Sequence, residues 1–389
     1  MRSNRTRAAA IIASAAVGIT SVAIAAPTQA ASAERGYTYN LATGKTNDPR
    51  TAALVKKITA KLPKNWRQQR EAFLGRTGAD PGPVAESAGA YLANSPCEPT
   101  ALDSYVEKLF NGVPEDVIFI LAIFGVFEYP TYDALLFGSR TDPEYALTPG
   151  TTGKVRQSAA AARSLWDIRS GDIHVMGMDS SMVVDHDRVS RIIQALFGAP
   201  ADEADEIAGL LIEIILSVGN LRDGDSPIFT LNAFAISDLE DNALPDKIVM
   251  GEGIIKALRA TGNIEVGPQM IFAHEFGHHI QYENDAIPDE ESPENTRMIE
   301  LMADAYGAYL DAHRKGLNFN TDRIMKASEV AHLVGDCQTD SPGHHGTPDQ
   351  RAAASLWGAR LAKQNRNTVL PSRVFETRFL DALPDILAH

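Results

Sequence analysis

The stretch MIFAHEFGHHIQYEND, residues 270–285, places three of the chain's ten histidines within six positions. Its apolar residues recur at helical spacing, which predicts a helix. On a helix, residues four apart share a face, so His274 and His278 should point their imidazoles the same way, about one turn apart. Two neutral imidazoles in that arrangement suit a zinc ion, and Glu275 between them is placed to accept a proton beside it.

A carboxylate further along the chain completes the expected ligand set. A catalytic zinc ion usually takes three protein ligands, and Glu300 follows His278 at an interval that allows a loop and a returning helix. Asp304 lies one turn beyond Glu300 on the same face, where it can accept the outer N–H of a ligating histidine. An ordinary solvated helix face is the alternative. Nitrogen and oxygen ligands favour Zn²⁺ without excluding Mn²⁺ or Fe²⁺.

These motifs resemble the gluzincin group of zinc metallopeptidases. HEFGH with a downstream E-x-x-x-D is similar to the group's ligand pattern, and NAFAI…DKIVMGEGIIKAL resembles a block of the minigluzincin-type peptidases. Three further motifs resemble the bacterial neutral zinc metallopeptidases, in that family's order: AHEFGHHIQ, ELMADAYGAYL and HGTPDQRAAASLWG. The resemblance covers roughly residues 226–361, so the chain before residue 150 and the tail after about 365 fall outside it.

The resemblance implies a fold as well as a site. It implies an α+β, zincin-like architecture: a small sheet with an edge strand beside the active-site helix, plus additional N-terminal helices. It further implies one catalytic Zn²⁺ held by His274, His278 and Glu300. Glu275 would be the general base, and Asp304 would accept a hydrogen bond from a ligating histidine without binding the metal itself.

The segment GHHGTPDQR, residues 343–351, offers a second donor for the oxygen of the attacked carbonyl. By the HGT…R resemblance we favour His345 over its neighbour His344, the alternative being a pair in a surface loop. Arg351 is expected to anchor this loop to a carboxylate. Where the bacterial family shows G-D-D, this chain has GDCQTD, with Cys337 in place of an acid. His279 is expected to be structural or exposed.

The function that these patterns favour is that of a secreted zinc-dependent peptidase, most simply an endopeptidase, acting on peptides or proteins through zinc-activated water and a glutamate general base. One alternative is an aminopeptidase or dipeptidase, which needs groups that catch a chain terminus. The other is a non-catalytic exported zinc-binding protein. The presence of Glu275, a general base that a structural site would not need, argues against this alternative.

The first 33 residues have the layout of a secretory signal peptide. A start with three arginines precedes an Ala/Ile/Val-rich run and the A-x-A signal at 31–33, which predicts a mature start near Glu34. Residues 23–25 offer a second cleavage site, and an uncleaved anchor is the alternative. The apolar run 117–127 is too short to span a bilayer comfortably and is expected to be a core element, so no stable membrane association is expected after signal removal. A formal charge of −14 argues against a nucleic-acid partner.

We divide the mature chain into a mostly helical region, residues 34–150, and a zincin-like catalytic domain, residues 151–389. The first could be a propeptide, a cap or a layer that completes the fold. Cys97 and Cys337 are expected to form a disulfide, as suits an exported protein; a Cys97 thiolate that caps the metal is the alternative. Helices are expected at 48–75, 98–110, 153–168, 186–198, 201–218, 269–283 and 297–316, with Gly316 as the last C-cap, and strands at 172–185, 226–237 and 246–255.

Overall fold

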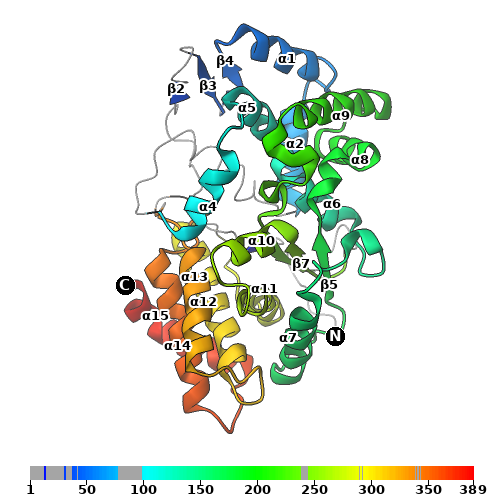
Figure 1. Ribbon diagram of the computed structural model, residues 1–389. Coiled ribbons are helices and arrows are strands. Elements are labelled where there is room, and N and C mark those ends of the chain that lie inside the picture. The colour runs from blue at the N-terminus through cyan, green and yellow to red at the C-terminus, as the bar shows by residue number, and fades with distance from the viewer. Residues whose placement is uncertain are drawn as a thin grey trace.

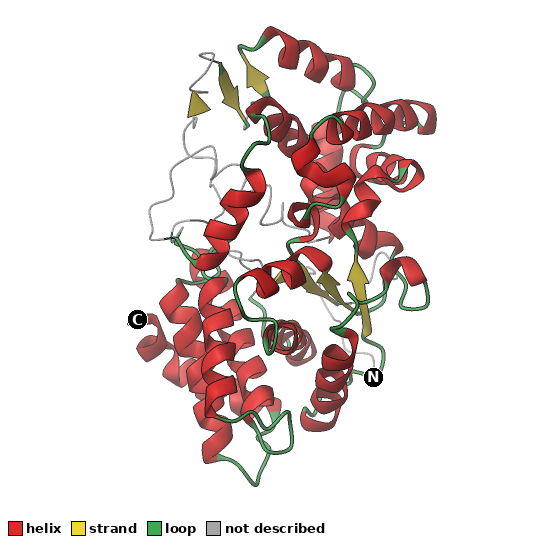
Figure 2. Ribbon diagram, viewed as in Figure 1, coloured by secondary structure: helices red, strands yellow, loops and turns green. Residues whose placement is uncertain are grey.

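The computed structural model describes residues 13–14, 30–31, 37–41, 43–77, 99–237, 244–288, 290, 292–337, 339, 341 and 343–389. The molecule is mixed α+β and mostly helical with a small sheet, as the sequence predicts. The sheet lies between an upper group of helices that includes α8 and α9 and a lower group that includes α12 and α14 (Figure 1). The same division is seen when the elements are coloured by type (Figure 2). Apart from the backbone at 13–14 and 30–31, the predicted signal peptide lies outside the described residues.

The main sheet has four strands in the order β1-β6-β7-β5, namely Ala13–Ser14, Ala233–Ile236, Lys247–Gly251 and His174–Met178. β6 and β7 are antiparallel, whereas β5 joins β7 in parallel. Every residue of β6 and β7 is buried, which is typical of strands covered on both faces. β1 pairs antiparallel with the outer edge of β6 and contacts α11. A second small sheet joins β2, Ala30–Ala31, to β3, Thr38–Asn40, and β4, Lys45–Thr46.

All three predicted strands are shorter than expected. The strand predicted over 172–185 is extended only at 174–178, and a 3₁₀ turn, η3 (Ser180–Val184), follows it. The strand predicted over 226–237 is preceded by a 3₁₀ turn, η5 (Pro227–Thr230), and only residues 233–236 are extended. The strand predicted over 246–255 ends at Gly251, where α10 (Glu252–Ala260) begins. The segment after Gly251 buries Ile254, Ile255 and Leu258, a helical spacing that outweighs the β-branched residues within it.

The helix predicted over 48–75 is two helices, α1 (Pro49–Thr59) and α2 (Trp66–Thr77). α1 begins as expected, because the Asp48 side chain accepts the backbone N–H of Arg50 at 3.0 Å. The helix stops before Pro63, whose ring removes an N–H and disfavours helical backbone at the residue before it.

Three helices follow, α4 (Ala101–Phe110), α5 (Glu115–Ile123) and α6 (Tyr129–Phe137), with the 3₁₀ turn η1 (Val126–Glu128) before α6. α5 and α6 are mostly buried, whereas α4 buries one face. The apolar run 117–127 is a core element, as predicted. Within the described part of the chain, no single helix has the length and apolar character of a membrane span. Taken together, the bent pair Glu115–Ile123 and Val126–Phe137 has the length and composition of a broken membrane span, by those two criteria alone.

The remaining helices surround the sheet. Their bounds are η2 Pro143–Tyr145, α7 Thr152–Leu165, η3 Ser180–Val184, α8 His186–Phe197, α9 Ala201–Leu216, η4 Gly219–Gly224, α11 Gly267–Asn284, α12 Pro293–Ala312, α13 Thr321–Leu333, α14 Pro348–Gln364 and α15 Ser372–Leu387. The prediction that α12 ends at Gly316 is wrong: the helix ends at Ala312, and His313 leaves helical backbone at ψ 140°. The backbone N–H of Gly316 instead closes a turn on the carbonyl of His313.

Close helix contacts at two glycines bring α11, α12 and α14 together. A Cβ at Gly307 would lie 2.9 Å from the backbone nitrogen of His274, so α12 touches the backbone of α11 there. A Cβ at Gly358 would lie 2.1 Å from the carbonyl oxygen of Ala305, so α14 touches α12 in the same way. Only a residue without a side chain permits this spacing. The side chains of all three helices therefore reach one small region.

Candidate metal centre

The structure brings His274, His278 and Glu300 together from two helices. The Nε2 atoms of the two histidines lie 3.0 Å apart. The Glu300 carboxylate lies 3.3 Å from Nε2 of His274 and 3.4 Å from Nε2 of His278. One ligand atom from each residue falls within 4.8 Å of the others, and all three residues are buried. Among the described residues, this is the one group of three or more such side chains found close enough to share a metal ion.

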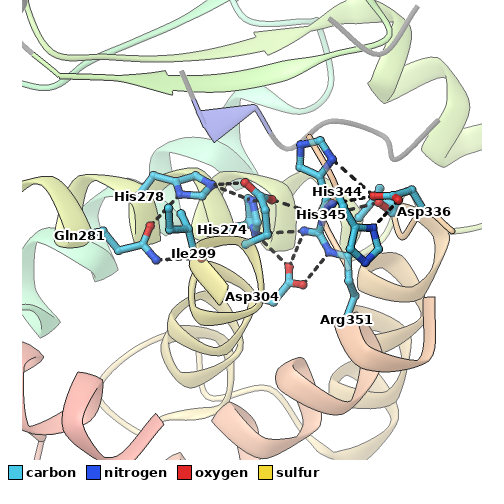
Figure 3. Close-up of polar contacts among 11 residues, drawn as sticks. His274, His278, Gln281, Ile299, Asp304, Asp336, His344, His345 and Arg351 are labelled. Carbon is cyan, nitrogen blue, oxygen red and sulfur yellow. Dashed lines mark hydrogen bonds and ion pairs between the residues drawn. The ribbon is translucent and has the colours of Figure 1, made fainter. Parts of the chain in front are cut away.

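The outer nitrogens of both imidazoles are already engaged (Figure 3). His274 Nδ1 donates to Asp304 at 2.9 Å, and His278 Nδ1 donates to the amide oxygen of Gln281 at 2.8 Å. The Gln281 amide nitrogen in turn donates to the carbonyl of Ile299, which fixes the orientation of the amide. With both outer nitrogens acting as donors, the two inner Nε2 atoms either share one proton, as the raised pKa of His274 favours, or both present a lone pair to a cation. Two such lone pairs beside a carboxylate suit a metal ion, so this donor set fits a bound metal ion.

The pKa values of the two imidazoles are shifted in opposite directions. Burial lowers the pKa of His274, but the hydrogen bond and charge of Asp304, with help from Glu300, raise it to about 9. Burial lowers the pKa of His278 to about 3, an effect that the charge of Glu300 offsets only in part. Burial alone would raise the pKa of Glu300, yet the surrounding histidines hold it well below its usual range. Glu300 is thus anionic and His278 neutral at neutral pH, whereas His274 would have to release its proton to bind a metal ion.

Arg351 lies beneath the histidines and binds Asp304 with two hydrogen bonds, from Nε at 2.8 Å and from Nη2 at 2.9 Å. Its Nη1 also lies 3.3 Å from Glu300. Asp304 is therefore the carboxylate to which Arg351 anchors its segment, as predicted. Glu275, next to His274 on α11, is fully buried as well. Glu300 and Asp304 face this one guanidinium, and the buried Glu275 adds a third carboxylate to the same region, so a cation would offset the negative charge that remains.

His344 and His345 both meet a residue that sequence reasoning missed. Asp336 accepts from Nδ1 of His344 at 2.5 Å and from the backbone N–H of His345 at 2.6 Å, and it lies 3.6 Å from Nδ1 of His345. Burial lowers the pKa of His345, but the charges of Glu300 and Asp336 raise it above its ordinary value. His344 is fully buried, whereas 12% of the His345 side chain is exposed. The signal in the sequence was the Gly-Asp pair just before Cys337.

Gln281 was also missed, although its position three residues after His278 on one helix was a usable signal. His279 is structural: it is buried, and its Nε2 lies 3.0 Å from the carbonyl of Lys247 on β7. Cys337 is disulfide-bonded in the structure. Its predicted partner, Cys97, lies outside the described residues, so the pairing stays a prediction.

No family model matches this chain, and comparison with curated proteins and with solved structures finds no significant match. What the centre can do must therefore be judged from its own geometry.

Proposed function

We propose that this chain is a secreted, zinc-dependent peptidase of zincin-like architecture that hydrolyses internal peptide bonds. The observation that carries the proposal is the convergence of two imidazole nitrogens and one carboxylate, with Glu275 in the same helical turn. A structural metal site has no use for such a buried carboxylate beside its ligands, whereas peptide hydrolysis requires a proton acceptor there.

A zinc ion bound by these residues would polarise the peptide carbonyl and bring the pKa of water toward neutral. Glu275 would take the proton of the attacking water and deliver it to the leaving amine. Asp304 would hold His274 in the tautomer whose Nε2 lone pair faces inward, and Gln281 would do the same for His278. Arg351 would keep Asp304 ionised and fixed.

The outer edge of β6 is the expected place for substrate backbone. In the structure the segment Ala13–Ser14 occupies this edge as an antiparallel strand and contacts α11, so the edge accepts an extended chain beside the metal helix. These two residues lie within the predicted signal peptide. Its removal would free the edge for substrate, which backbone hydrogen bonds would then hold.

His345 supports the proposal as the donor toward the oxygen of the attacked carbonyl. The charge of Glu300, together with Asp336, raises the pKa of His345, and Asp336 also accepts its backbone N–H, so protonation of the imidazole is favoured and the backbone that carries it is held in place. A donor placed in this way stabilises the charge that develops as the carbonyl is attacked.

The test compares cleavage of an unfolded protein substrate by wild type and by Glu275→Gln at equal zinc occupancy. General-base loss should slow cleavage by about 10²–10⁴-fold while the bound zinc stays unchanged. Glu213→Gln, an exposed site on α9, is the control and should cleave at the wild-type rate. Equal rates for wild type and Glu275→Gln would remove the catalytic assignment and leave a metal-binding protein. Release of single residues from a chain end, in place of internal cleavage, would make the enzyme an exopeptidase.

A further inference from the structure

A cavity of about 680 Å³ lies beside β5. It is bounded by the segment after α6, the first three turns of α7 and the outer side of β5. The metal helix α11 packs against β6 and β7, whereas β5 is the strand at the far side of the sheet from β1 and β6. The cavity therefore belongs to a part of the molecule that the proposed peptidase reaction does not use.

Three arginines line this one cavity: Arg140, Arg156 and Arg163. Arg163 is held by the carbonyls of Ser170 and Ile173, at 3.3 and 3.4 Å. Arg140 and Arg156 are exposed at the rim of the cavity, and neither has a hydrogen bond or an ion pair among the described residues. Their guanidinium groups are thus available, each with several donors in a planar fork that matches an oxyanion.

The cavity lining contains too little negative charge to neutralise its three arginines. The carboxylate in its lining is that of Asp142, and one of its oxygens is already used to accept the backbone N–H of Glu144. The chain as a whole carries a formal charge of −14, so this pocket with three guanidinium groups is a locally positive site on an acidic protein. Fixed positive charge in a concave site concentrates anions there.

The rest of the lining indicates the shape of the ligand. The hydroxyl groups of Thr141 and Thr152 add polar groups, whereas Ala146, Leu147 and Val175 present accessible apolar surface. An apolar wall next to polar anchors is the usual build of a small-molecule site. A bare inorganic ion would use the arginines but not the apolar wall.

We infer that this cavity binds a small organic oxyanion that carries two negative charges on an apolar body. Two guanidinium groups would hold the anionic head, and the apolar side of the cavity would cover the body. This inference is independent of the proposed peptidase activity, because it uses none of the residues of the metal centre.

Calorimetric titration of the full chain in 0.15 M salt tests it with three probes: phenyl phosphate, phthalate and inorganic phosphate. We expect saturable binding of phenyl phosphate or phthalate, and weaker binding of inorganic phosphate, which lacks an apolar body. Phenyl phosphate alone would identify a phosphate ester as the natural class, and phthalate alone a dicarboxylate.

The double variant Arg140→Ala/Arg156→Ala should weaken that binding at least tenfold. Arg360→Ala, an exposed arginine on α14 outside the cavity, is the matched control and should bind within twofold of wild type. The absence of saturable binding by either organic probe would overturn the inference, and so would equal affinity in wild type and the double variant. Far-ultraviolet circular dichroism of each variant shows that the fold is kept.

Discussion

Asp304 connects His274 of the candidate metal centre to Arg351, because it accepts hydrogen bonds from both. Its pKa lies below its ordinary value: burial raises it, but the charges of Arg351 and His274 lower it more. The residue therefore remains an anion inside a buried site. Its removal should change metal binding through His274, although Asp304 is not itself one of the proposed ligands.

Asp304→Asn should weaken zinc binding by about 10–100-fold, since the partner that orients His274 and raises its basicity is changed. Competition against a chromophoric zinc chelator measures this directly. Asp385→Asn, an exposed site on α15, serves as the control for the loss of one charge. Wild-type zinc affinity in Asp304→Asn would show that Asp304 has no role at the metal.

A second buried acid, Asp311, has no hydrogen-bond partner for either carboxylate oxygen. Burial raises its pKa to about 8, although the charge of Arg323 acts in the opposite direction. The folded state thus holds a proton that the unfolded chain releases near pH 4. The stability that this proton contributes is fully present below that pH and is lost as the pH rises through about 8.

Asp311→Asn should therefore gain stability over wild type as the pH rises. We expect the difference in free energy of unfolding to grow by about 2–5 kcal/mol between pH 4 and pH 9, measured by urea unfolding of both proteins at each pH. Other titrating groups are common to the two proteins and cancel. A difference that does not change with pH would contradict the protonated state of Asp311.

At the scale of single elements, spacing in the sequence predicted most helices and placed the metal helix correctly. Patterning failed where local chemistry decides a boundary, as at Pro63 and after Gly251. The approach of α14 to α12 could not be predicted, because it depends on which glycines face a neighbouring backbone. Glu300 could be proposed as a ligand because its interval from His278 fits a returning helix. Asp336 could not be paired with His345, because that contact depends on how the loop between them folds.

Gly358→Ala should destabilise the fold by about 1–3 kcal/mol, because a methyl group there overlaps the backbone of α12 and forces it to shift. Gly209→Ala is the matched control, since it lies on α9 with no atom within 4 Å of the added carbon. That variant should gain about 0.5–1 kcal/mol. Thermal unfolding of both variants measures the two effects. Equal shifts would contradict the close contact of α14 and α12.

At the scale of the whole molecule, one hydrophobic core includes residues from both predicted regions. Phe127 stacks on Phe229 with ring centroids 5.8 Å apart, and Trp66 meets Phe197 at 5.6 Å. These contacts favour the reading in which residues 34–150 complete the fold. The domain boundary near 150 remains a prediction.

The predicted Cys97–Cys337 disulfide would tie the N-terminal region to the segment that carries Asp336. Reduction should lower the stability of the exported protein by about 2–4 kcal/mol, seen as a lower melting temperature with a reductant. A Cys97→Ser/Cys337→Ser variant should melt at the lower temperature with or without reductant. Reductant sensitivity that persists in this variant would contradict the pairing.

The central claim is that two imidazoles and one carboxylate hold a single divalent ion. Its most direct measurement is the zinc content per chain, by mass spectrometry of metals, in the wild type, Glu300→Ala and Glu275→Gln after equilibration with zinc and removal of the excess. We predict one zinc ion per chain in wild type and in Glu275→Gln, and a large loss in Glu300→Ala. A wild-type protein without zinc, or Glu300→Ala with a full complement, would contradict the claim.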